Sequence, residues 1–188
     1  QVQLFSERKQ KAKGYCTPFD SDRICSPEDV IMGGGGLFGT NSMFYRRTDA
    51  LEFTRWVPKC SPVGDYPAVV FYATKGLVCY SARVMSCYRV DVPGSWTSRL
   101  NSANSNQRFK HIEAVNQMLK EIDIKTDHAY SEAINRHLAD VTFDYALAEG
   151  DLKILLSNNS FKTQYRALPL TSRAKARAKC ILKKLKSD

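Results

Sequence analysis

The sequence predicts an α+β protein, with an antiparallel sheet at about residues 42–93 followed by a helical half at about residues 107–186. Short runs of β-branched and aromatic residues, separated by turn residues, fill the first of these regions. A stretch rich in Ser and Asn, residues 93–107, then marks a boundary. Beyond this stretch, apolar residues recur every three or four positions, which is the period of an amphipathic helix.

Residues 1–41 are expected to form a basic arm, a short helix and a glycine-rich connector. Ser26 suits the N-cap, Pro27 suits the first helical position, and two acidic residues follow in the first turn. The four glycines at residues 33–36 should end this helix, since each costs about 1 kcal/mol in a helix interior. A phosphate-binding turn needs a strand before its glycines and a helix after them, so this reversed order favours a hinge.

The region of residues 42–93 is expected to supply the strands of the sheet. Lys75 and Gly76 would form a two-residue hairpin turn between two strongly apolar runs. The candidate strands are residues 42–45, 50–57, 68–74, 77–84 and 86–92.

The region of residues 107–188 is expected to be helical, and the whole chain to form one compact domain. Two long helices follow one another, and Gly150 should close the second of them. A basic helix comes last. Its apolar stripe consists of Ala174, Ala178, Ile181 and Leu185. This helix could pack on the core with Ile181, Leu182 and Leu185 inward; as a membrane-surface helix its Ala-rich stripe looks too thin to bury deeply.

The net charge of +9 lies entirely in two terminal segments. Residues 1–13 carry four bases and one acid, and residues 171–188 carry seven bases and one acid, whereas residues 14–170 carry 17 of each. Basic terminal segments typically bind polyanions. The chain contains no run of 18 apolar residues that would predict a transmembrane helix.

The sequence therefore predicts non-enzymatic binding of a polyanion, with RNA as the first candidate, in an assembly such as a ribonucleoprotein or capsid. An acidic protein and a homo-oligomer are further candidate partners, and no cofactor or metal is expected. The residues expected to neutralise phosphates are Arg173, Lys175, Arg177, Lys179, Lys183 and Lys184, assisted by Arg8, Lys9, Lys11 and Lys13. The rings expected to stack on bases are Tyr45, Tyr88 and Tyr165, because an arginine follows each of them in the sequence.

A secreted, disulfide-stabilised effector or toxin is the alternative from another class. Its support is the cysteine count, the start at Gln1 and a glycosylation sequon at Asn158. An intracellular or virion-associated location is slightly favoured over secretion. Cys180 lies on the basic tail, so the candidate disulfide cysteines are Cys16, Cys25, Cys60, Cys79 and Cys87.

A small hydrolase or transferase is the third possibility, although no nucleophile elbow or zinc-type cysteine spacing supports it. His128 and His137 are nine residues apart, about 180° around a helix, so they would not share a metal. Glu132, Arg136, Asp140 and Asp144 follow at intervals of four, with the sign alternating over the first three, which is typical of a solvated helix face.

Overall fold

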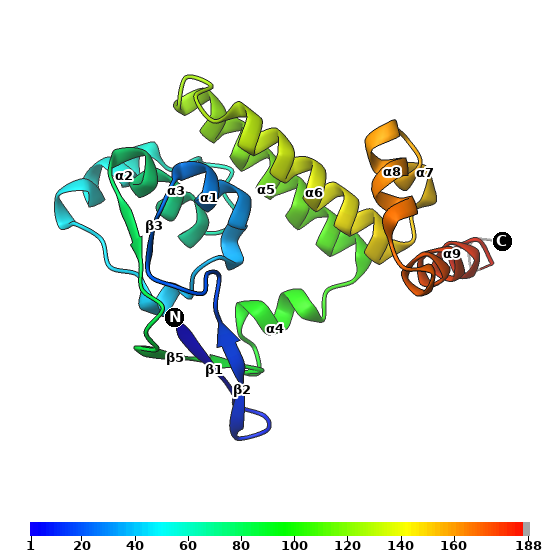
Figure 1. Cartoon of the computed structure of the whole chain (residues 1–188), viewed down its shortest axis with the longest axis horizontal. Coiled ribbons are helices and arrows are strands. Elements are labelled where there is room, and N and C mark those ends of the chain that lie inside the picture. Colours follow the sequence, from blue (N-terminus) through cyan, green and yellow to red (C-terminus); the bar gives the residue numbers. More distant parts are fainter. Residues whose placement is uncertain (186–188) are drawn as a thin grey trace. The chain divides into compact units, whose positions relative to one another are not determined.

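The computed structural model describes residues 1–185, which divide into two compact units, Gln1–His137 and Leu138–Asp188, the latter described up to residue 185. The predicted α+β class is confirmed, because 58% of the chain is helical and 12% is in strands. The predicted helical C-terminal half is also confirmed, as the green-to-red ribbon of Figure 1 shows.

The N-terminal residues, which were expected to form a basic arm, form a β-hairpin. Strand β1 (Val2–Ser6) pairs antiparallel with β2 (Lys11–Cys16) and parallel with β5 (Ser86–Val90), giving the sheet order β2-β1-β5. Val2 and Ser6 are buried on one side of the sheet, and the Ser6 hydroxyl donates a 2.6 Å hydrogen bond to Asp91. The hairpin is therefore anchored by β1, the central strand of this sheet.

The predicted helix start at Ser26 is confirmed. Helix α1 (Pro27–Gly33) follows the short strand β3 (Arg23–Cys25), which pairs antiparallel with β4 (Val78–Tyr80). The Ser26 hydroxyl accepts a hydrogen bond from the Asp29 amide, and the Asp29 carboxylate accepts one from the Ser26 amide, which makes a capping box. The 3₁₀ turn η1 (Gly34–Gly36) ends the helix.

Two of the expected strands are helices and a third, residues 42–45, forms no strand, so the predicted hairpin at Lys75 and Gly76 is wrong as well. Residues 50–57 contain α2 (Ala50–Trp56), preceded by the 3₁₀ turns η2 (Thr40–Ser42) and η3 (Arg47–Asp49). Residues 68–74 lie within α3 (Asp65–Lys75), and Lys75 and Gly76 lead from this helix into β4. Helix α3 is buried on most of its surface, so its apolar residues have no readable period, and such a run cannot be assigned from sequence alone.

Unit 1 continues through helices α4 (Trp96–Asn101) and α5 (Ser105–Lys125) into the start of α6 (Ser131–Glu149). Asn104 caps α5 in a second capping box, with Gln107 as its partner. The predicted apolar stripe of α5 includes Leu119 and Ile122, which are fully buried.

Unit 2 comprises the rest of α6 with α7 (Leu152–Leu155), α8 (Asn159–Ala167) and α9 (Leu170–Lys184). The side chains of Asp151 and Asn158 cap α7 and α8. The core of this unit consists of Phe143, Ala146, Leu155, Phe161, Tyr165 and Ala176. Each of the three helices after α6 therefore supplies at least one buried side chain.

Candidate polyanion-binding surfaces

Gly150 fixes helix α9 in place. Its φ of +70° ends α6 in a Schellman motif, in which the Gly150 amide donates to Leu147 O and the Asp151 amide donates to Ala146 O. A Cβ at Gly150 would lie 2.6 Å from Ala176 O and 2.7 Å from Lys179 Cβ. Glycine is thus required here both by its backbone conformation and by the close approach of α9.

One face of α9 packs on the other helices of unit 2, and this divides the predicted phosphate-binding residues into two groups. Ala176 is 1% exposed, Tyr165 Oη donates a 3.2 Å hydrogen bond to Arg173 O, and Lys179 Nζ donates a 2.6 Å hydrogen bond to Ala148 O. Arg173 is half-buried, whereas Lys175 and Arg177 are exposed. The backbones of Lys183 and Lys184 belong to α9, but their side chains lie outside the described part of the structure.

The charge of helices α7 to α9 has no local compensation. Residues 152–185 contain nine lysines and arginines and no aspartate or glutamate. Three of the nine were not expected at this surface: Lys153 on α7 and Arg166 on α8, which are both exposed, and Lys162 on α8, which is half-buried. The sequence signal that could have found them is the absence of acids over the whole stretch, which extends well before residue 171.

The hairpin presents the second basic surface. Arg8, Lys9 and Lys11 are exposed at and beside the turn. Lys13 Nζ lies 3.5 Å from an Asp91 carboxylate oxygen. The hydrogen bond from Ser6, with a further contribution from Lys13, lowers the pKa of Asp91, so this carboxylate stays ionised and offsets part of the hairpin charge.

The three predicted stacking rings lie in different surroundings. Tyr45 stacks on Tyr72 with ring centroids 4.2 Å apart, and burial raises its pKa to about 12. Tyr165 is 3% exposed and belongs to the core of unit 2. Tyr88 pairs with Leu4, on the same side of the sheet as the buried Val2.

Sequence reasoning missed a more exposed ring, Tyr15, on the other side of this sheet. Phe5 and Tyr15 both lie there, because Tyr15 pairs with Gln3, two residues before Phe5 on β1. Tyr15 is 55% exposed, and the exposed Arg89 pairs with Phe5 from β5. Alternation along residues 2–6 was the available signal, since Val2, Leu4 and Ser6 share the opposite face.

All six cysteines are free thiols, so the disulfides that their even number permitted are not formed in the structure. Cys16 and Cys87 pair with adjacent residues of β1. Cys25 pairs with Val78 and Cys79 pairs with Ile24, so these two cysteines are also one position out of register. Adjacent strand positions face opposite sides, which keeps the thiols of each pair apart. Burial raises the pKa of Cys25. The six are Cys16, Cys25, Cys60, Cys79, Cys87 and Cys180.

His128 lies in the loop before α6, where the sequence predicted helix. Its Nδ1 is 2.8 Å from Asp123 Oδ2, and Ser131 Oγ donates to the other carboxylate oxygen at 2.7 Å. Burial alone would raise the pKa of Asp123, but these two hydrogen bonds outweigh it and lower the pKa. Among the described residues there is no cluster of three or more metal-ligating side chains. The predicted solvated face is present, with an exposed Arg136–Glu132 pair at 2.6 Å.

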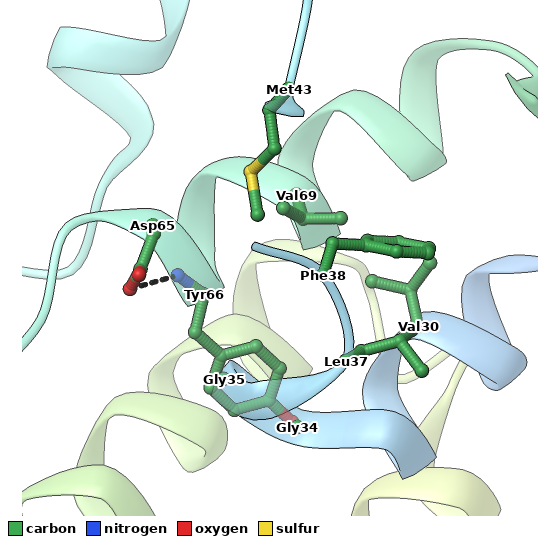
Figure 2. Close-up of a pocket in the computed structure, with 9 residues that line it drawn as sticks. All are labelled: Val30, Gly34, Gly35, Leu37, Phe38, Met43, Asp65, Tyr66 and Val69. Carbon is green, nitrogen blue, oxygen red and sulfur yellow. Dashed lines mark hydrogen bonds between the residues drawn. The ribbon is translucent and has the colours of Figure 1, made fainter. Parts of the chain in front are cut away.

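The glycine run borders a shallow pocket in unit 1, whose lining Figure 2 shows. Gly34 has a φ of +65°, and a Cβ there would meet the ring of His137 at 3.0 Å. Gly35 packs against Tyr66, whose hydroxyl donates to Ile31 O at 2.7 Å. The pocket is smaller than the roughly 300–1,000 Å³ of small-molecule sites. A Cβ would therefore be crowded at Gly34 by His137 and at Gly33 by the side chain of Leu37, whereas at Gly35 it would make only an ordinary van der Waals contact.

No family model, curated protein or solved structure matched the chain when each was compared with it. Within the described residues, no helix is both long enough and apolar enough to cross a membrane.

Proposed function

We propose that this protein binds RNA without catalysing a reaction, by neutralising phosphates with the exposed bases of α7 to α9 and of the β1–β2 hairpin. The observation that carries the proposal is the stretch of nine bases without an acid in residues 152–185. Lysine and arginine side chains that lack acidic neighbours attract a polyanion, and binding releases its condensed counterions. The neutral charge balance of residues 14–170 supports the assignment of binding to the ends of the chain.

Lys175 and Arg177 are the central phosphate contacts of this proposal. Both side chains are exposed on α9, and neither is needed to hold the helix in place, a role that falls to Ala176 and Lys179. Arg166 adds an exposed guanidinium on the preceding helix, α8. Such contacts position the backbone of a nucleic acid and carry no information about its sequence.

The outer face of the β2-β1-β5 sheet supports a preference for single strands. Tyr15 and Phe5 share this face with Arg89, and unpaired bases can stack on exposed aromatic rings. Arg89 NH1 is 3.9 Å from Glu7 and remains largely exposed, so its guanidinium is open to a phosphate or a base. In this proposal the aromatic rings of the sheet stack on the nucleobases of the RNA, and the basic side chains of the hairpin contact its phosphates.

Charge-neutralising variants test the proposal, with binding measured by fluorescence anisotropy of a labelled single-stranded RNA at low salt. Deleting α9 would remove Ala176 from the core of unit 2, so substitutions are the cleaner change. We expect the Lys175→Gln, Arg177→Gln double variant and the Arg8→Gln, Lys9→Gln double variant each to bind several times more weakly.

The matched control replaces two exposed lysines of the neutral region, Lys59→Gln and Lys110→Gln, and removes the same charge. We expect this control to keep most of the wild-type affinity. Equal losses in the control and in the α9 variant would show that only net charge matters, and undetectable binding by the wild type would refute the proposal.

A further inference from the structure

Helix α9 exposes an apolar stripe that phosphate binding does not use. Ala176 faces the core, and the large side chains on the opposite side are Leu170, Ile181, Leu182 and Leu185, which are 75%, 58%, 57% and 70% exposed. At about 100° per residue, these four lie within about 60° of the direction opposite Ala176. Ala174 and Ala178 complete the stripe and are exposed as well.

The stripe points away from the core, which corrects the expectation of inward packing, and it is wider than the sequence predicted. Ile181, Leu182 and Leu185 do not pack inward on the core of unit 2. Leu170 and Leu182 widen the stripe beyond the four residues read from the sequence. The stripe spans about 24 Å at 1.5 Å per residue, and its large side chains lie mainly in the C-terminal part of the helix.

Cations flank the stripe on both sides. Lys175 and Arg177 lie about 100° to either side of Ala176, so each emerges at one edge of the apolar face. No acidic residue lies on α9 or on the two helices before it. In cross-section the helix therefore has one face held by the protein, two cationic edges and one aliphatic face outward.

This cross-section suits an anionic lipid surface better than a second copy of the chain or an RNA. A second copy would bring its own cationic edges against these, and lysine is depleted in protein–protein interfaces, which favour aromatic residues that this stripe lacks. RNA phosphates gain nothing from aliphatic side chains. An interfacial helix buries Leu and Ile at the boundary of headgroups and acyl chains while its lysines and arginines meet anionic headgroups.

We propose that α9 docks on anionic membranes, with Ile181, Leu182 and Leu185 entering the interface and Lys175 and Arg177 contacting lipid headgroups. The helix lies in the plane of the surface without spanning the bilayer. The face that carries Ala176 and Lys179 stays on unit 2 during docking, so no unfolding is required.

Co-sedimentation of the full chain with vesicles tests this proposal. We expect binding to phosphatidylcholine vesicles that contain phosphatidylserine, and much weaker binding to phosphatidylcholine alone. The Lys175→Gln and Arg177→Gln changes should each lower binding about fivefold, the usual effect of one base near an anionic surface. Ile181→Ser and Leu182→Ser should lower it by about fivefold each, through lost burial of the exposed part of each side chain.

The control is Leu77→Ser, which changes a leucine of unit 1 that is 76% exposed, and this variant should bind vesicles as the wild type does. Because the Ile181→Ser, Leu182→Ser variant keeps every charge, its RNA affinity and melting temperature should stay at wild-type values, which separates this inference from RNA binding. Failure of the wild type to bind anionic vesicles would overturn it. So would a serine variant that binds vesicles normally but loses self-association or stability, since the stripe would then be a protein contact.

Discussion

Replacing Gly150 by alanine should destabilise unit 2 strongly, although the change adds only one methyl group. An alanine at this position would have to keep a φ of +70°, which costs roughly 1–2 kcal/mol for a residue other than glycine. Its Cβ would also lie 2.6 Å from Ala176 O and 3.0 Å from Cys180 N, both backbone atoms of α9. Overpacking of this kind costs about 1–3 kcal/mol. We therefore expect a total loss of about 2–5 kcal/mol.

The assay is urea unfolding, in which hydrogen exchange of the amides in residues 152–185 reports the stability of unit 2. Gly94→Ala is the matched control, because Gly94 has a φ of +73° and nothing lies within 4 Å of a Cβ there. The difference between the two variants isolates the contact with α9 from the cost of the backbone conformation. If Gly150→Ala costs no more than Gly94→Ala, the claim that Gly150 sets the position of α9 is wrong.

Three further predictions concern single residues. Tyr15→Ala should weaken binding of single-stranded RNA by about 1–3 kcal/mol and leave binding of an abasic strand unchanged, as measured by anisotropy. Under native conditions a thiol reagent should label exposed Cys79 well before buried Cys25, and the intact mass should equal that of the fully reduced chain. Burial lowers the pKa of His111, so the free energy of unfolding should fall as the pH drops below about 6.5, and His111→Gln should reduce this loss in urea titrations.

The parts of the fold that follow local rules could be predicted from sequence. The cap at Ser26, the end of α6 at Gly150 and the stripe of α5 depend on neighbouring residues in the chain, and all three are present. Helix α3 could not be predicted, because a helix that is buried on most sides reads like a buried strand. The parallel pairing of β1 with β5 joins residues more than 80 positions apart, and no local pattern specifies it.

The candidate surfaces were predictable in charge but not in orientation. The count of bases located Lys175 and Arg177 correctly on an exposed helix, yet it could not say that the apolar stripe faces outward. Gly150 sets that direction, because its missing Cβ lets the side of α9 that carries Ala176 approach closely, so the leucines point outward. The same limit applies to Tyr15, whose exposure depends on which side of the sheet the rest of unit 1 covers.

The salt dependence of RNA binding tests the central claim most directly. For single strands, the logarithm of the binding constant falls with the logarithm of salt concentration by about 0.7 per phosphate neutralised. The Lys175→Gln, Arg177→Gln variant should therefore have a slope shallower than that of the wild type by about 1.4. The Lys59→Gln, Lys110→Gln control should keep the wild-type slope. A slope that does not change in the α9 variant would contradict phosphate neutralisation by these two side chains.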